Sequence, residues 1–435
     1  MARYVQAFSI GGLRRSSCHR HPSLVAAFQS QSSQITVYQE QKQQPLWKVS
    51  TLLFSSTSDS SSAAEESPTD DGANNQKKKK KRIVFLGTPE VAATSLQAIY
   101  EASLQQDSPY EIVGVVTQPP KRRKRKGQPE SSPVGKLSEA LGIRVLCPEK
   151  AKDIDFLDLL QNEIQPDLCI TAAYGQYLPK RFLATPVLGT VNIHPSLLPR
   201  WRGASPVQRS LQAGDNPVGV SVLYTVSQMD AGPLIVQREQ CIDENDTATT
   251  VLPLLFDIGT KCLLEVLPDI CSGKITFDTA TPQDDDQAVA ATMIDTAEGE
   301  FKVWEESAVS CHNRLRGFSM WPQAFLYLQV GDREPMKVKV TETRVVVSDE
   351  ATEPMAQTES TTNVVQLGPT KQSGLYVTCF DGSILELVEV QPATRKAFRG
   401  RDFQNGYPGE TIRWVRTPED QAADPEKYNS RAAKA

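Results

Sequence analysis

The stretch Arg82-Ile-Val-Phe-Leu-Gly87-Thr88-Pro89-Glu90 decides the fold class, because an apolar run ending in glycine is followed at once by helix-start residues. Such a run is typical of a strand buried on both faces of a parallel sheet. Thr88 is predicted as the N-cap of a helix, with Pro89 in its first turn and Glu90 favoured by the helix dipole. The stretch therefore predicts a β-strand followed directly by an α-helix.

The same alternation continues along the chain. Further strands are predicted at 111–117, 168–173, 189–194 and 218–225, and helices at 133–141, 205–214 and 247–272. Repeated β-α-β units predict an α/β domain with a doubly wound, mostly parallel, Rossmann-like sheet. We place this domain at residues 82–283.

The sequence pattern changes after residue 292, where the alternation of strands and helices ends. Short β-rich runs at 336–343, 363–367, 375–380 and 384–390 are separated by polar turns. They predict a small antiparallel, OB-like β-barrel. We place the barrel at 301–416, with an acidic linker at 284–300 before it and a disordered tail at 417–435 after it.

The N-terminal segment has the composition of an organelle transit peptide. Four arginines occur among the first 20 residues, and no acidic residue precedes Glu40. Residues 55–76 are too polar to bury a core. Residues 1–81 are therefore predicted to be a transit peptide and a disordered basic linker. The mitochondrial matrix is the expected destination, and a plastid is the alternative.

Composition excludes several classes of protein. The chain has 435 residues, 39% of them hydrophobic and 23% charged, as expected for a globular monomer of two domains. No apolar run is long enough to span a membrane. Eight cysteines are scattered without a C-x-x-C pair, so no metal site is predicted. The net charge of -5 hides basic runs at 77–82 and 121–126, which favour a polyanionic partner.

Histidine is the most informative residue type, because only four occur and two of them lie in the predicted transit peptide. A lone histidine is more often structural, but the context of His194 reverses that interpretation. Asn192 and His194 are two apart on a predicted strand, so they project from the same face near its carboxyl end. An amide donor beside an imidazole suits acyl transfer, in which an oxyanion develops.

The sequence Asn192-Ile-His-Pro-Ser-Leu-Leu-Pro-Arg-Trp-Arg-Gly-Ala-Ser-Pro206 resembles the signature of the formyl-tetrahydrofolate-dependent formyltransferases. Its Arg-Trp-Arg-Gly part is most similar to the members that formylate methionyl-tRNA. The resemblance runs from Ile83 to about Gln404 and includes Met229-Asp-Ala-Gly232.

This resemblance implies a third catalytic residue, Asp230, which orients His194 while Asn192 and His194 stabilise the oxyanion. It implies 10-formyltetrahydrofolate as co-substrate and no metal. The implied folate-binding residues are Ser196, Leu197, Leu198 and Pro199, faced by Ala173, Tyr174 and Gly175.

The implied acceptor is the α-amino group of initiator methionyl-tRNA. Phosphate neutralisation by Lys and Arg supplies affinity for RNA without sequence choice. The predicted tRNA-binding residues are Lys121, Arg122, Arg123, Lys124, Arg125 and Lys126 in one loop, Arg200 and Arg202 after the signature strand, and Arg395 and Lys396 in the barrel. The role of the basic run at 77–82 stays open.

Two alternatives remain at this stage. One is another formyltransferase or hydrolase of the same type that acts on a small amine. The other is an inactive RNA-binding relative, which would have no chemical reason to keep Asn192, His194 and Asp230 together.

Overall fold

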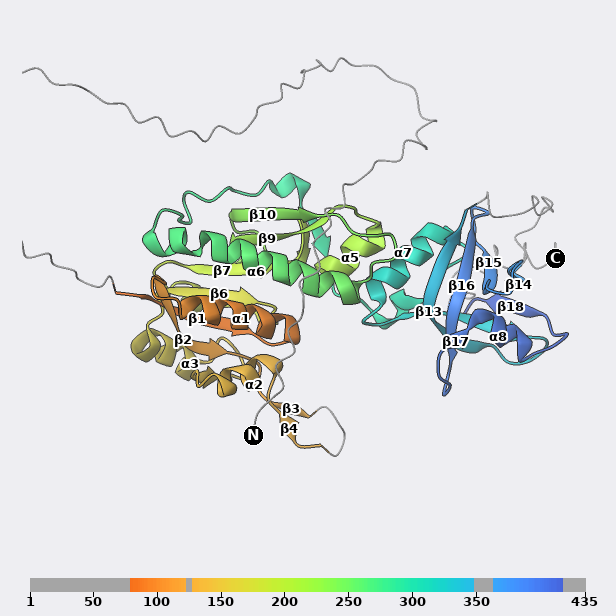
Figure 1. Ribbon diagram of the computed structural model, residues 1–435, viewed down its shortest axis with the longest axis horizontal. Helices are drawn as coiled ribbons and strands as arrows, with labels where there is room; N and C mark the ends of the chain where they lie inside the picture. The colour runs from red at the N-terminus through yellow and green to blue at the C-terminus, as the bar shows by residue number, and fades with distance from the viewer. Residues whose placement is uncertain (1–78, 123–126, 348–362, 418–435) are drawn as a thin grey trace, which may run out of the picture. The chain divides into compact units, whose positions relative to one another are not determined.

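The computed structural model describes residues 79–122, 127–347 and 363–417, in which an α/β region precedes a strand-rich C-terminal region (Figure 1). The predicted transit peptide, residues 123–126 and most of the predicted tail lie outside the described residues. No helix among the described residues has the length and apolar character that crossing a membrane requires.

The first sheet has the strand order β10-β9-β7-β6-β1-β2-β5. Its strands are β1 (Lys81–Gly87), β2 (Tyr110–Val116), β5 (Val145–Leu146), β6 (Leu168–Ala172), β7 (Thr190–His194), β9 (Val218–Tyr224) and β10 (Leu234–Gln240). Strands β5, β2, β1, β6 and β7 are parallel, whereas β9 is antiparallel to both of its neighbours. The predicted mostly parallel α/β sheet is confirmed.

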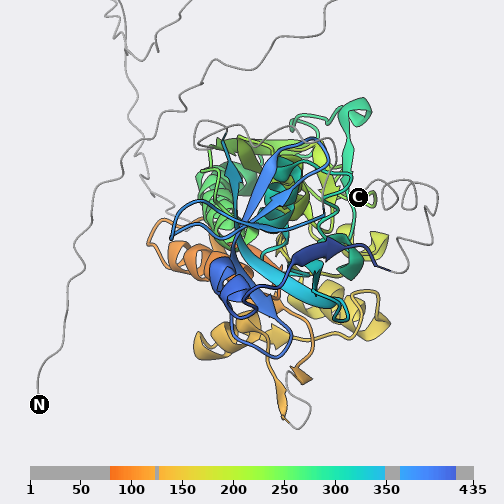
Figure 2. The same cartoon turned by 90° about the vertical axis from the view of Figure 1, so that its right-hand side faces the viewer.

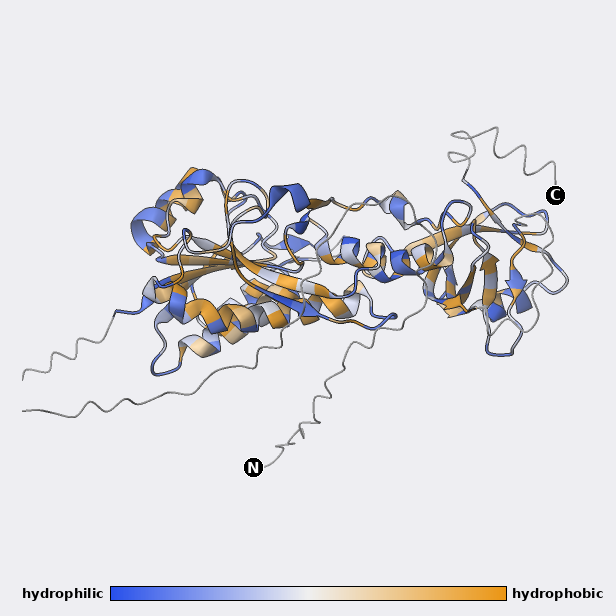
Figure 3. Cartoon of the chain, turned by 90° about the horizontal axis from the view of Figure 1, so that it is seen from above, coloured by the Kyte–Doolittle hydropathy of each residue, from blue (hydrophilic) through white to orange (hydrophobic). Residues whose placement is uncertain are grey.

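Alternating side chains of β1 show why the sheet is covered on both faces. Ile83 and Phe85 join a core with α1 (Glu90–Ser103) and α6 (Ala248–Ser272). Val84 and Leu86 point the other way, into a core with α3 (Ile154–Leu159). A strand with both faces buried is mostly apolar, and Figure 3 shows hydrophobic stretches along the strands of this sheet.

The predicted helices are present, but one predicted cap is wrong. Helices α2 (Pro133–Ala140) and α5 (Pro206–Ala213) begin at proline, and α5 ends at Gly214 with φ +78°. The predicted N-cap Thr88 is wrong, because Pro89 occupies that position and the Thr88 hydroxyl donates to the Tyr174 carbonyl at 3.0 Å. A contact between two strand ends thus takes the hydroxyl away from the helix.

The C-terminal sheet has the strand order β14-β15-β16-β13-β12-β18, with β17 beside β16. Its strands are β12 (Ala324–Val330), β13 (Met336–Val346), β14 (Gln366–Leu367), β15 (Leu375–Thr378), β16 (Ile384–Pro392), β17 (Phe398–Arg399) and β18 (Ile412–Val415). A bridge between Val364 and Arg413 joins the two ends of this order, so the sheet is nearly closed (Figure 2). The predicted barrel is confirmed.

Helices α7 (Ala308–Phe318) and α8 (Gly400–Asn405) belong to this second region. Cys311 and Leu315 of α7 and Phe403 of α8 lie in the core that the barrel strands enclose. The apolar residues of the barrel therefore form a core separate from those of the first sheet.

The segment predicted as an acidic linker has secondary structure of its own. It contains two short 3₁₀ helices, η2 (Asp285–Gln287) and η3 (Thr296–Gly299), and strand β11 (Val289–Ala291). Strand β11 pairs in parallel with β8 (Arg200–Gly203), which follows the His194 loop. This pairing joins the linker to the catalytic signature.

Candidate active site

Strand β7 places Asn192 and His194 on the same face at its carboxyl end. Ile193, between them, is buried on the opposite side in the core with α6. His194 is 5% exposed and Asn192 is half-buried. The period of the strand, rather than any local turn, therefore brings the amide and the imidazole together.

The Asn192 amide is oriented from the neighbouring strand. The Thr171 hydroxyl of β6 lies 2.8 Å from Asn192 Oδ1 and donates to it. An amide whose oxygen accepts in this way must present its two N–H groups elsewhere. Asn192 is thus available as a donor through Nδ2.

Both ring nitrogens of His194 face acceptors. Nε2 lies 3.0 Å from the Trp201 carbonyl oxygen, and Nδ1 lies 3.6 Å from Asp230 Oδ2. A carbonyl can only accept, so this contact places a proton on Nε2. The Nδ1 distance suits an ion pair but exceeds that of an ordinary hydrogen bond.

Asp230 reaches His194 from the connection between β9 and β10. Tyr224, the last residue of β9, pairs with Val191, so the connection leaves the sheet before it returns to His194. Asp230 has φ +50°, a left-handed conformation that is unfavourable for a residue with a Cβ. Its Oδ2 accepts a hydrogen bond of 2.9 Å from the Gly203 N–H.

The predicted folate loop after His194 is held by polar contacts. The Ser221 hydroxyl donates to the Ser196 carbonyl at 2.7 Å, and Gln237 Nε2 donates to the Leu198 carbonyl at 2.8 Å. Ser196 and Leu198 are buried, Pro199 is half-buried, and Leu197 lies against Gly219 of β9. These hydrogen bonds therefore hold the loop in place beside Asn192 and His194.

The segment predicted to face the folate loop, residues 173–175, contains both exposed and buried residues. Ala173 and Gly175 are exposed and have φ +47° and +80°. Tyr174 is buried between them, and within the described residues its hydroxyl has no hydrogen-bond partner. Burial, with smaller contributions from Cys147 and Asp153, raises the pKa of Tyr174 to about 12. The wall therefore presents backbone rather than the tyrosine ring.

The predicted tRNA-binding residues lie in different settings. Lys121 and Arg122 are exposed in β3 (Lys121–Arg122), which pairs with β4 (Pro129–Glu130), whereas residues 123–126 of the loop lie outside the described residues. Arg395 and Lys396 are exposed between β16 and β17. These positions are accessible to a polyanion, and their role stays a prediction.

Arg200 and Arg202 make internal contacts. Arg200 donates twice to Asp215, at 3.0 and 2.9 Å, and its guanidinium lies 4.4 Å from the centre of the Trp201 ring. Burial would raise the pKa of Asp215, but hydrogen bonds from Arg200 and Trp201 outweigh it and the pKa is lowered. Arg202 is only 9% exposed and pairs with Asp285 at 2.8 Å. It lies on a structural contact rather than on an open surface.

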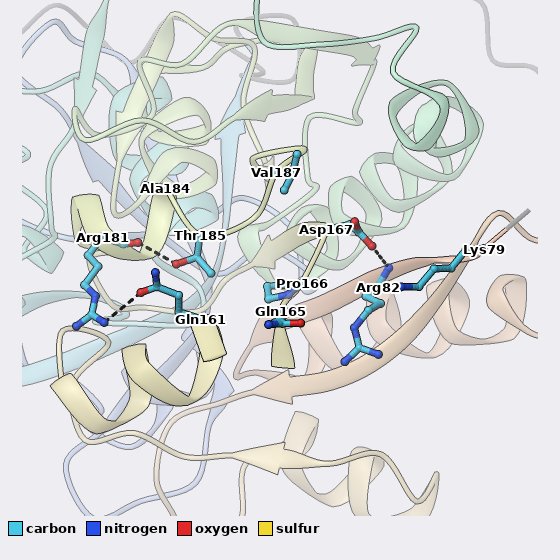
Figure 4. Close-up of a pocket in the computed structure, with 10 residues that line it drawn as sticks. All are labelled: Lys79, Arg82, Gln161, Gln165, Pro166, Asp167, Arg181, Ala184, Thr185 and Val187. Atoms are coloured by element: carbon cyan, nitrogen blue, oxygen red, sulfur yellow. Dashed lines mark hydrogen bonds between the residues drawn. The ribbon is translucent and has the colours of Figure 1, made fainter. Parts of the chain in front are cut away.

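A cavity of about 410 Å³ lies at the other end of the strands, among residues such as Arg82, Gln165, Asp167 and Arg181 (Figure 4). These residues precede or begin β1 and β6 or lie in α4 (Lys180–Leu183). The cavity is thus at the amino ends of the parallel strands, away from His194. Among the described residues, no three His, Cys, Asp or Glu side chains are grouped so as to hold a metal ion.

Comparisons with known proteins agree with this geometry. The family described as formyl transferase matches residues 81–267, and its C-terminal domain matches residues 293–408. The methionyl-tRNA formyltransferase of Bacillus velezensis is 34% identical over 76% of this chain and 97% of its own length. That of Myxococcus xanthus is 34% identical over 75% of this chain and 95% of its own length.

The chain belongs to the methionyl-tRNA formyltransferase family. This membership confirms the predicted family, the predicted enzyme class and the predicted transfer of a formyl group to methionyl-tRNA. Among solved structures, the sugar 3N-formyl transferase WlaRD is similar at 18% identity and a TM-score of 0.49, over 73% of this chain and all of that one.

Sequence reasoning about the methionyl-tRNA formyltransferase signature missed Thr171, Ser221 and Gln283. Each supports the signature from a distant part of the chain, by a hydrogen bond to Asn192, to Ser196 or to Asp230. Thr171 and Ser221 stand out only as hydroxyls within apolar strand runs, and Gln283 carries no local signal.

Proposed function

We propose that Asn192, His194 and Asp230 transfer the formyl group of 10-formyltetrahydrofolate to the α-amino group of initiator methionyl-tRNA, for translation initiation in an organelle. The roles of these three residues are assigned mainly from one distance: Asp230 Oδ2 lies 3.6 Å from His194 Nδ1. The Asn192 amide lies beside this pair, and its oxygen accepts a hydrogen bond from Thr171.

In the proposed reaction the amine nitrogen bonds to the formyl carbon, and the bond from that carbon to N10 of the folate breaks. The proton lost by the amine ends on N10. Negative charge develops on the formyl oxygen as the tetrahedral intermediate forms, and preorganised donors stabilise it. Asn192 Nδ2 is one such donor, because the hydrogen bond from the Thr171 hydroxyl to Asn192 Oδ1 fixes the orientation of the amide.

His194 supplies the second donor in this proposal. Its Nε2 lies 3.0 Å from the Trp201 carbonyl oxygen, and in this proposal the formyl oxygen takes the place of that carbonyl as acceptor when the donor binds. Asp230 keeps the ring oriented through Nδ1 and stabilises positive charge on it while the amine proton moves. The proposal requires no metal.

The donor is proposed to bind between the loop 196–199 and the segment 173–175. Hydrogen bonds at both walls hold their backbones in place, so little ordering is needed when a ligand enters. Backbone groups of Ala173 and Gly175 are exposed there and suit the polar edge of a pterin.

The tRNA is proposed to contact the exposed loop that contains Lys121 and Arg122 and the barrel turn with Arg395 and Lys396. The N-terminal composition supports import into the mitochondrial matrix, with a plastid as the alternative. The enzyme is proposed to be a monomer that does not associate with membranes.

One assay tests the acceptor and the donor together. The purified mature chain is incubated with 10-formyltetrahydrofolate labelled in the formyl carbon and with initiator methionyl-tRNA, elongator methionyl-tRNA or free methionine. The proposal predicts label on initiator methionyl-tRNA above all others. Release of free formate at the same rate without tRNA would indicate a hydrolase, and tRNA binding without label transfer would indicate an inactive relative.

A second assay tests the basic loop. Lys121→Gln with Arg122→Gln is expected to raise KM for tRNA and to flatten its dependence on salt, because fewer counterions are released. Lys261→Gln with Lys274→Gln is the matched control, since it removes the same charge from exposed positions on or just after α6. If the two double variants change KM for tRNA and its salt dependence equally, the loop has no special role in tRNA binding and this part of the proposal is wrong.

A further inference from the structure

Gln283, the last residue before the linker, contacts the segment that carries Asp230. Its Nε2 donates to the Asp230 carbonyl at 2.8 Å and to the Gly232 carbonyl at 2.7 Å. Its Oε1 accepts from Arg202 Nε at 3.0 Å. Both side-chain amide hydrogens and the oxygen are therefore used, and all three contacts are with segments that carry the catalytic signature.

These contacts close a ring around the carboxylate. Arg202 precedes Gly203, whose N–H donates to Asp230 Oδ2 at 2.9 Å. Gln283 links the Arg202 side chain back to the Asp230 carbonyl. Two sets of hydrogen bonds therefore fix the position of Oδ2. One involves the Gly203 N–H, and the other involves the side chain of Gln283.

Other bonds fix Gln283 itself. Leu234 and Thr281 exchange two backbone hydrogen bonds, of 2.7 and 2.9 Å, directly before Gln283. The ion pair of Arg202 with Asp285 follows two residues after it, and the pairing of β11 with β8 begins at Val289. The linker therefore presents Gln283 to the catalytic loops in one orientation.

Asp230 needs such support for two reasons. Its φ of +50° is unfavourable, so neighbouring contacts must hold the backbone in that conformation. Its Oδ2 also lies 3.6 Å from His194 Nδ1, so a small displacement decides whether the two groups interact strongly.

We infer that Gln283 is a positioning residue for formyl transfer, which holds Asp230 in its left-handed conformation and sets the carboxylate against His194. The inference rests on the proposed role of the trio. It also extends the site beyond the signature, because Gln283 is the last residue of the first domain and lies far from the signature in the sequence.

The test compares two glutamines of the same segment. Gln283→Glu keeps the size of the side chain and an oxygen for Arg202 but removes both donors to the carbonyls. Gln287→Glu is the control, because Gln287 donates to Asp284 at 2.7 Å and its bond stays within the exposed start of the linker. We expect kcat to fall about 100-fold for Gln283→Glu, with both KM values within about twofold of wild type. Gln287→Glu should retain wild-type kinetics.

A second measurement reads the position of Asp230 without activity. Amide hydrogen exchange at Gly203 should be faster in Gln283→Met than in wild type, because its acceptor Oδ2 is no longer held, and unchanged in Gln287→Met. Unchanged exchange at Gly203, or wild-type kcat in the Gln283 variants, would overturn the inference. If exchange at Gly203 is faster in Gln283→Met but the wild-type enzyme transfers no formyl group, only the proposed function is refuted.

Discussion

His194 and His312 are both buried, at 5% and 9% exposure, yet their surroundings differ in kind. His194 faces a carbonyl and a carboxylate at the carboxyl end of β7. His312, on α7, lies 2.9 Å from the Thr343 hydroxyl and 3.2 Å from the Glu244 carbonyl. Burial is similar in both, so the carboxylate partner and the neighbouring amide are what distinguish His194, the histidine proposed to be catalytic.

The charge around His312 supports a structural role. Burial is the largest cause of its lowered pKa, the Glu244 carbonyl opposes it, and the charge of Arg316 adds to it. Arg316 also donates to the Asp246 and Asp243 carbonyls, at 2.8 and 3.2 Å. His312 and Arg316 therefore hold α7 against the loop 243–246.

The largest effect is expected for His194→Ala. Loss of the ring removes both the oxyanion donor and the group that Asp230 orients, so kcat should fall by about 10³-fold or more. Retention of methionyl-tRNA on a filter should stay near the wild-type value. Loss of tRNA binding together with activity would make His194 a structural residue like His312.

Asp230→Asn should have the next largest effect. The amide can still accept from the Gly203 N–H but carries no charge to stabilise a protonated ring. We expect a fall of about 10²-fold in kcat with little change in KM for the folate. Wild-type kcat in this variant would show that the carboxylate is only a turn residue.

His312→Leu is expected to act on stability alone. It leaves the Thr343 hydroxyl and the Glu244 carbonyl without this partner, which costs about 1–3 kcal/mol of unfolding free energy. Thermal or urea unfolding measures the change, and kcat below the melting range should match wild type. A large fall in kcat would place His312 with His194 and break the comparison.

The smallest effect is a pH dependence of stability. Because the pKa of His312 is lowered in the folded state, the unfolded chain binds the proton more readily. Stability is therefore fully present above the unfolded value of about 6.5 and falls as pH drops from there toward the folded pKa, by no more than about 1.4 kcal/mol per unit. His312→Leu should lose less stability than wild type between pH 7.5 and 5.5; an identical loss would contradict the assignment.

The sequence predicted those parts of the fold and site that depend on local pattern. The period of two along 190–194 put Asn192 and His194 on one face, and apolar runs marked the strands around them. Turn and cap residues gave the limits of α5 within one residue, and the amphipathic pattern did the same for α6.

What the sequence could not predict depends on contacts between distant segments. Only the resemblance implied that Asp230 orients His194; no local pattern could, because Asp230 comes from a connection that leaves the sheet beside Val191. The contacts of Thr171 and Gln283 span 21 and 53 residues. The role of Arg202 in tRNA binding stays a prediction, whereas its contacts with Gln283 and Asp285 appear only in three dimensions.

A double-mutant cycle on His194 and Asp230 tests the central claim most directly. Single-turnover formylation of methionyl-tRNA is measured for wild type, His194→Ala, Asp230→Asn and the double variant. If the carboxylate acts through the ring, adding Asp230→Asn to His194→Ala should reduce the rate little further, within about threefold. A further fall equal to the full effect of Asp230→Asn alone would show that the two residues act independently and would contradict the account.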